Sequence, residues 1–413
     1  MSNIVESDKT KKNIGREVYL DYAALTPIDG EVLAKMLPYY LPQYSNPSSI
    51  HENGRRSKKA LEDARGEIAR VLHAFPEEII FTSSGTEADN LAIVGVARGN
   101  REKGNHILIS AVEHKAVLES AKYLREEGFE VEIIPVDKYG MIDVKKVLTL
   151  VRKGTILISV MLVNNEIGTT QPIRELSSAL KKLNLPSCPL LHTDACQASN
   201  LLSLDVLELG IDLMTINSSK IYGPLGVACL YKKSGVILKP IFRGGEQENN
   251  LRAGTENLPL IIGFAEALKK AEKMIKKEFK RFAKLEIYFK KKLKTKIPEI
   301  IFNGHPKMKI PSTVHVTIPG IEGESVVLLL DRYGIRASTG SACSALDLRP
   351  SHVLTAIGQN PDLIHGSVRF SMGRSTTKKN LDKVLKIFPE IIQKLRSISV
   401  LTLKNHQKKD EKK

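Results

Sequence analysis

The sequence predicts an α/β fold built around a mainly parallel β-sheet. Short apolar runs alternate with helical patterns along the first half of the chain, and parallel strands need helical crossovers of this kind. We expect strands at residues 78–81, 106–110, 131–135, 156–163, 190–193, 213–217 and 226–231, and helices at residues 87–97, 115–127 and 144–151.

A smaller α/β domain is expected in the second half. From residue 268 to residue 293 apolar side chains recur every three or four positions, which predicts one long helix with a solvated lysine face. Strand candidates follow at residues 312–318, 325–331 and 367–371, with a closing helix at 378–397. We expect a large domain at residues 16–262, a small domain at 263–400 that includes residues 1–15, and a basic, disordered tail at 401–413.

The composition is typical of a globular protein of the cytoplasm. The 413 residues are 42% hydrophobic and 26% charged, and no apolar run has the length of a membrane span or a secretory signal. The four cysteines are sparse and lack metal-ligand spacing. We therefore expect free thiols in a reducing compartment, with neither a disulfide framework nor a metal site.

Positive charge is concentrated in the second half. Residues 1–230 sum to −3 and residues 231–413 to +19, with the excess in the long helix and the tail. A solvated helix face is the simplest explanation, although a basic surface also attracts acidic proteins and nucleic acid. No aromatic-interleaved binding motif accompanies the lysines, so an acidic protein is favoured over nucleic acid.

Asp194 and Lys220 follow expected strands of the large sheet. Open α/β sheets bind their ligands at the carboxyl ends of the strands. A lysine amine can hold pyridoxal phosphate as a Schiff base, and a carboxylate that keeps the ring nitrogen protonated makes the cofactor an electron sink. We interpret Lys220 and Asp194 as such a pair; the alternative for Asp194 is a surface aspartate at the end of a strand.

Gly85 and Thr86 end a small, hydroxylated segment that opens directly into a helix. Free backbone N–H groups and the positive end of the helix dipole would suit a phosphate there. Taken in isolation, these residues favour ordinary helix capping.

Cys343 is the candidate nucleophile. It lies among the small and polar residues 338–345, which are unsuited to a core, whereas Cys229 stands in an apolar run and is typical of a buried small hydrophobe. A reactive thiol needs exposure and mobility. Only the setting of Cys343 suggests both.

Further motifs extend this pattern along the chain, at residues 19–24, 46–47, 86–90, 113–115, 164–168, 252–257 and 369–371. In their order and content they resemble the NifS and IscS family of cysteine desulfurases, within the class V aminotransferase group, from about residue 18 to residue 396. The resemblance implies a fold-type I pyridoxal phosphate enzyme. Such an enzyme has a mainly parallel seven-stranded sheet in its large domain and a smaller α/β domain, and it is a homodimer.

The resemblance also implies roles for single residues. His114 matches the histidine that stacks on the cofactor ring and moves protons. Asn165 and Gln197 match contacts to the cofactor's phenolic oxygen, and Asn165 also matches a contact to the substrate carboxylate. Arg369 matches the arginine that clamps this carboxylate, a task for a bidentate fork. Thr255 matches a residue that reaches the phosphate held by the neighbouring subunit.

Two positions depart from the family pattern. Most relatives carry a histidine immediately before the Schiff-base lysine and a serine two places before that histidine, and both help to hold the phosphate. This chain has Ser219 and Asn217 there. Ser219 donates one hydrogen bond but supplies no imidazolium charge, so we expect weaker phosphate binding.

The implied reaction converts L-cysteine to L-alanine. Lys220 or His114 moves the α-proton, and the Cys343 thiolate takes the substrate sulfur as a persulfide, destined for iron–sulfur cluster assembly or tRNA thiolation through an acceptor protein. Two alternatives stand beside it. One is a selenocysteine lyase, and the other is a cofactor-poor interaction protein in a sulfur relay, to which Ser219 and the basic second half would also fit.

Overall fold

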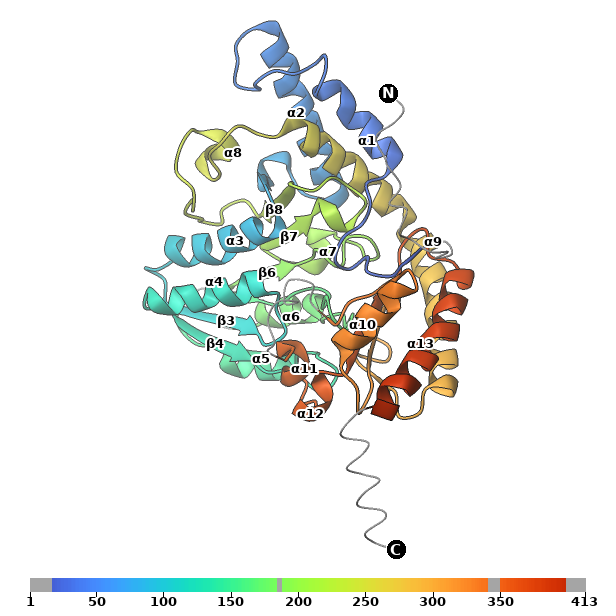
Figure 1. Cartoon of the computed structure of the whole chain (residues 1–413). Coiled ribbons are helices and arrows are strands. Elements are labelled where there is room, and N and C mark those ends of the chain that lie inside the picture. Colours follow the sequence, from blue (N-terminus) through green and yellow to red (C-terminus); the bar gives the residue numbers. More distant parts are fainter. Residues whose placement is uncertain (1–16, 184–187, 341–349, 399–413) are drawn as a thin grey trace, which may run out of the picture.

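The structure, a computed structural model, describes residues 17–183, 188–340 and 350–398. Its centre is a seven-stranded sheet in the order β2-β8-β7-β6-β5-β3-β4 (Figure 1). β8 (Ala228–Lys232) is antiparallel to both of its neighbours, and the remaining pairs are parallel. The predicted α/β class with a mainly parallel sheet is confirmed.

Burial of the strands explains why the sequence predicted this sheet. The strands β3 and β5 are buried along their length, and strands buried on both faces are continuous apolar runs. The edge strand β4 is largely exposed and carries two glutamates, which discourage pairing with another chain. The bounds are β2 (Ile79–Thr82), β3 (His106–Ser110), β4 (Glu130–Ile134), β5 (Thr155–Ser159), β6 (Leu190–Asp194) and β7 (Leu213–Asn217).

Helices connect and cover these strands. Those between the strands are α3 (Gly85–Gly99), α4 (Lys115–Glu126), α5 (Val144–Leu150), α6 (Ile173–Leu180) and α7 (Val206–Leu209). Two helices that we did not predict, α1 (Gly30–Met36) and α2 (Glu52–Leu72), precede the sheet, and the short α8 (Gln247–Asn250) follows β8. None of the helices within the described residues is long and apolar enough to span a bilayer.

The second half contains a smaller antiparallel sheet in the order β12-β10-β9. Its strands are β9 (Ile301–Phe302), β10 (Thr313–Thr317) and β12 (Ser367–Ser371), and its helices are α10 (Gly323–Arg332), α11 (His352–Ala356), α12 (Pro361–Ile364) and α13 (Lys378–Ile398). Nearby, β1 (Val18–Tyr19) pairs in parallel with β11 (Ile335–Arg336). The start of the described chain is thus fastened to the second half.

One predicted strand is wrong. Residues 325–331 belong to the helix α10, in which Val326 and Leu330 are buried four positions apart on one face. A short apolar run does not distinguish a strand from a buried helical turn. Its three consecutive leucines favour the helix.

The long helix α9 (Leu258–Lys296) contains 39 residues and starts ten residues earlier than predicted. It packs against α1 and α2 at one end and against α13 at the other (Figure 1). Residue 262 therefore falls inside a continuous helix. The division of the chain at this residue remains our proposal.

Candidate active site

The predicted site residues of the large sheet follow the carboxyl ends of five parallel strands. Because β7, β6, β5 and β3 are consecutive neighbours in the sheet, these ends meet at one edge. Gly85 and Thr86 come after β2, His114 after β3, Asn165 after β5, Asp194 and Gln197 at and after β6, and Asn217, Ser219 and Lys220 at and after β7.

Lys220 ends the short 3-10 helix Ser218–Lys220 that follows β7. Its Nζ donates to the carbonyl oxygens of Ala23 (2.9 Å) and Ala24 (2.5 Å), and the Gln197 Nε2 donates to the same Ala23 oxygen at 2.8 Å. Lys220 and Gln197 also line one small cavity of about 30 Å³. The amine is therefore held beside the segment that follows β1, close to the end of β6.

Asp194 is buried, and its Oδ1 accepts a hydrogen bond from the Cys196 N–H at 2.9 Å. The charge of Asp194 acts on two further buried carboxyls. Burial, and then the charge of Asp194, raise the pKa of Glu113 to about 8 and raise the pKa of Asp89 well above its usual value. Such a negative, buried position suits a protonated ring nitrogen, so the residues present fit pyridoxal phosphate.

A second feature fits the phosphate of that cofactor. A Cβ at Gly85, the first residue of α3, would lie 3.1 Å from the Cys196 Sγ and 3.5 Å from the Asn217 Nδ2. The Asn217 Oδ1 accepts hydrogen bonds from the N–H and the Oγ of Ser219, both at 3.1 Å. This leaves the Nδ2 donor of Asn217 directed toward the start of α3. The two residues that depart from the family pattern, Ser219 and Asn217, are therefore hydrogen-bonded to each other.

His114 and Asn165 lie on the other side of Asp194. The His114 Nδ1 caps α4 by accepting from the Ala116 N–H at 3.1 Å, so this nitrogen is unprotonated in the cap. The backbone carbonyl oxygen of Asn165 accepts a hydrogen bond from the Arg369 Nη1 at 3.0 Å. Asn165 thus links the edge of the large sheet to the small one.

Arg369 is fully buried on β12. Besides Asn165, its partner is Asp21, which accepts from Nη2 at 2.8 Å. Asp21 belongs to the motif at residues 19–24, for which we predicted no role. Sequence spacing held no signal for a pair this far apart.

The two remaining predicted residues are Thr255 and Cys343. Thr255 is exposed and lines, with Thr82 and Ser83, a cavity of about 200 Å³. Cys343 lies outside the described residues. The residues that flank the segment 341–349 both approach Glu166: the Ser351 Oγ donates to its Oε2 at 2.6 Å, and a Cβ at Gly340 would lie 3.1 Å from the same oxygen.

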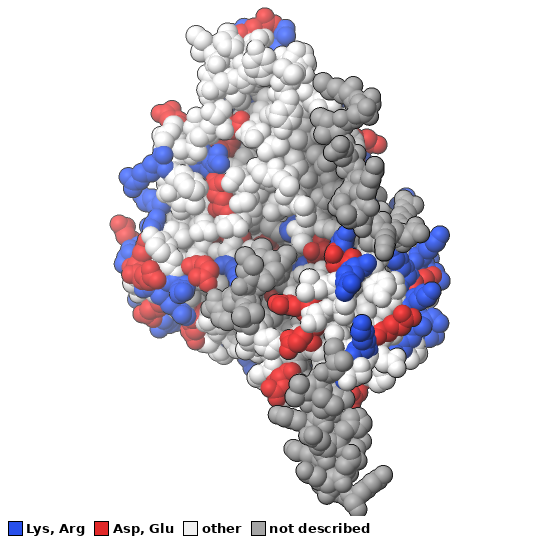
Figure 2. Space-filling view, viewed as in Figure 1, with Lys and Arg blue, Asp and Glu red and all other residues white. Residues whose placement is uncertain are grey.

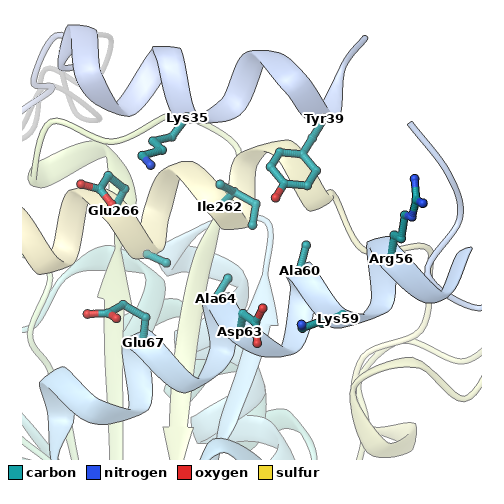
Figure 3. A pocket seen from close by; sticks show the side chains of 11 residues that line it. Lys35, Tyr39, Arg56, Lys59, Ala60, Asp63, Ala64, Glu67, Ile262 and Glu266 are labelled. Atoms are coloured by element: carbon teal, nitrogen blue, oxygen red, sulfur yellow. The ribbon is translucent and has the colours of Figure 1, made fainter. Parts of the chain in front are cut away.

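Other surface features are separate from this edge. A larger cavity of about 390 Å³ lies between α1, α2 and α9 (Figure 3), and its lining includes lysines such as Lys35 and Lys59 as well as acids such as Glu67 and Glu266. Its mixed charges favour no single ligand class. Within the described ranges, no three His, Cys, Asp or Glu side chains are grouped to hold a metal ion.

Comparison with known proteins identifies the family. Residues 18–384 match the model of the aminotransferase class-V family. The cysteine desulfurase IscS of Dictyoglomus turgidum is 46% identical over 93% of this chain and 96% of its own length. The chain belongs to the cysteine desulfurases of this family. The IscS of Methanosarcina thermophila is likewise 46% identical, over 95% of this chain and 96% of its own.

Solved structures agree with this membership. A NifS-like protein matches with a TM-score of 0.86 and 34% identity, covering 92% of this chain and 100% of its own. The predicted fold-type I architecture and the predicted family are confirmed. As a class-V cysteine desulfurase, the enzyme depends on pyridoxal phosphate and takes sulfur from L-cysteine.

Proposed function

We propose that the residues at the carboxyl edge of the large sheet form the desulfurase centre. Lys220 makes the covalent bond to the cofactor, Asp194 faces its ring nitrogen, and His114 covers the ring. Gln197 and Asn165 serve its phenolic oxygen. The phosphate lies at the start of α3, against Gly85, Thr86, Asn217 and Ser219. The observation that carries this proposal is the placement of Asp194, Lys220 and Gly85 at the ends of nearby strands.

Side chains of this protein carry out substrate binding, proton transfer and attack on sulfur. Bound pyridoxal phosphate withdraws electrons from the α-carbon of the substrate. Arg369 binds the substrate carboxylate together with Asn165, and Lys220 or His114 moves the α-proton. The Cys343 thiolate attacks the substrate sulfur, so that an S–S bond forms and the C–S bond breaks. The electron pair of the broken bond stays on the β-carbon of the substrate, which takes up a proton. The product then leaves as L-alanine.

We further propose a homodimer. Apolar side chains between residues 28 and 50 are unusually exposed, with Leu41 at 76% and Ile50 at 91%. Apolar surface of this extent marks an interaction site, and a second copy would also bring Thr255 toward the neighbour's phosphate. The apolar residues are Ile28, Leu33, Leu37, Tyr40, Leu41, Tyr44 and Ile50.

The sulfur acceptor is proposed to be a protein of iron–sulfur cluster assembly or tRNA thiolation, a purpose that fits the family of the IscS relatives. Basic side chains on the α9 and α13 side of the molecule (Figure 2) favour an acidic surface on one partner. The cytoplasm is the proposed compartment, because Cys188, Cys196 and Cys229 are free thiols.

The test measures L-alanine and sulfide from L-cysteine with wild type, Lys220→Ala and Cys343→Ala. Equal amounts of both products from wild type alone support the proposal. Mass spectrometry after chemical reduction should find the cofactor attached to Lys220. The exposed Lys239→Ala serves as the control and should retain full activity. Elimination from selenocysteine by Cys343→Ala would favour a selenocysteine lyase, and folded protein that binds no cofactor would favour the sulfur-relay alternative.

A further inference from the structure

Three carboxyl groups are buried together beneath the proposed cofactor site. Asp194 is 6% exposed, Asp89 1% and Glu113 0%, and they come from β6, from α3 and from the segment after β3. Three negative charges in one buried cluster would repel one another strongly. At least part of the cluster must therefore carry protons.

Among the described residues, one hydrogen-bond donor reaches the Glu113 side chain. Its Oε1 accepts from the Met161 N–H at 2.6 Å, and its Oε2 is buried without a hydrogen-bond partner among the described residues. The imidazole of His352, on α11, contacts the peptide oxygen of Glu113 at 2.9 Å instead of the carboxyl. A charged Glu113 would thus have a single hydrogen bond.

His192 does not neutralise the cluster. Its Nε2 is 3.7 Å from the Asp89 Oδ1, but burial lowers its pKa to about 4, so the ring is neutral at physiological pH. Its ring nitrogens lie 2.8 Å from the Ser159 Oγ and 3.2 Å from the Thr215 Oγ1. Lys220 is a cation in this region, and its positive charge acts on the Cys196 thiol.

We propose that Glu113 is a positioning residue that stores a proton beside Asp194 and releases it when the cationic ring of the cofactor reaches Asp194. This inference rests on the proposed placement of the cofactor. The proton passes from the Glu113 carboxyl to the buffer, and no electron pair moves to another group. In the proposed site, Asp194 is the member of the cluster that faces the ring.

The electrostatics give the direction of the effect. Burial and the charge of Asp194 raise the pKa of Glu113 to about 8, so roughly nine in ten Glu113 side chains are protonated at pH 7. A cation at Asp194 cancels the second cause, and the pKa of Glu113 then falls. Binding of the cofactor below pH 8 must release protons from Glu113, and by linkage the affinity for the cofactor rises with pH in this window.

The experiment titrates cofactor-free protein with pyridoxal phosphate by calorimetry in buffers of different ionisation heat. At pH 7 wild type should release more protons per bound cofactor than Glu113→Gln, by up to about one proton. At about pH 9.5, where Glu113 is already ionised, the two proteins should release equal numbers. The exposed Glu119→Gln, on α4, makes the same chemical change outside the cluster and should behave as wild type.

Equal proton release by wild type and Glu113→Gln at pH 7 would overturn the inference. A measurement without any variant is the infrared difference spectrum of wild type before and after cofactor binding. It should lose a protonated-carboxyl band, and an unchanged band would also overturn the inference. If Asp194→Ala binds the cofactor as wild type does, the proposed site itself fails; if Asp194 is required and proton release is unchanged, only the role of Glu113 fails.

Discussion

Arg369 and Asp21 are 348 positions apart in the chain, and the Arg369 Nη2 donates to the Asp21 Oδ1 at 2.8 Å. Because the Arg369 Nη1 also donates to the Asn165 oxygen, the guanidinium is fixed at two of its three nitrogens. Its Nε is buried without a partner among the described residues. A planar fork already oriented in this way is suited to a carboxylate.

Arg369→Lys should raise the KM for L-cysteine by roughly tenfold to a hundredfold with a smaller change in kcat. Lysine keeps the positive charge but cannot hold both Asp21 and Asn165 while it binds a carboxylate. Steady-state alanine production measures both constants. Arg336→Lys, on β11, is the control and should leave KM unchanged, and an unchanged KM in both variants would remove Arg369 from the substrate site.

Asn217→Ala should weaken pyridoxal phosphate binding about tenfold, or ~1.4 kcal/mol. The substitution removes the Nδ2 donor that faces Gly85 and the acceptor that orients Ser219. Equilibrium dialysis of cofactor-free protein gives the dissociation constant. The exposed Asn105→Ala provides a matched control, and wild-type affinity in Asn217→Ala would argue against a phosphate at this end of the site.

Stability should fall in acid, partly through His315. This histidine is paired opposite Arg369 in the small sheet, and burial, followed by the charge of Arg369, lowers its pKa to about 3. The unfolded chain binds a proton near pH 6.5 and the folded one does not, so this contribution is present above pH 6.5 and is lost as the pH falls toward 3.

His315→Gln should therefore lose less stability than wild type between pH 7 and pH 4.5, by about 2 kcal/mol. Urea unfolding at both pH values measures the difference. The exposed His365→Gln should follow wild type. Parallel losses in all three proteins would show that His315 is not a source of the acid sensitivity.

Leu41→Glu should convert the proposed dimer into a monomer. The side chain is 76% exposed in the single chain, and a charge there would have to be buried at the interface. Light scattering gives the molecular mass. Leu207→Glu, on α7, changes a leucine of nearly equal exposure, 75%, outside the apolar segment and should leave the mass unchanged. A dimeric Leu41→Glu protein would place the interface elsewhere.

The sequence predicted the large sheet well for a physical reason. Strands such as β3, β6 and β7 are buried, so their apolar runs coincide with the observed bounds to within one residue. Polar residues after such runs necessarily collect at one edge of a parallel sheet, which made Asp194 and Lys220 recognisable. The run at 325–331 failed because local pattern alone does not separate strand from helix.

Contacts between segments that are distant in the chain could not be predicted from the sequence. The pairing of Asp21 with Arg369, and the collection of Asp89, Glu113 and Asp194 in one cluster, depend on how the elements are packed and leave no periodic trace in the sequence. Asp89 and Glu113 were each visible inside a motif. Nothing in the motifs indicated that their carboxyls share one buried environment.

The lysine proposed to bind the cofactor and the arginine proposed to bind the substrate carboxylate belong to different sheets: Lys220 follows β7 of the large sheet, and Arg369 lies on β12 of the small one. A bound amino acid would connect the two sheets, with its amino end at the large sheet and its carboxylate at the small one. The distance between the sheets would then select ligands whose amine and carboxylate are one carbon apart.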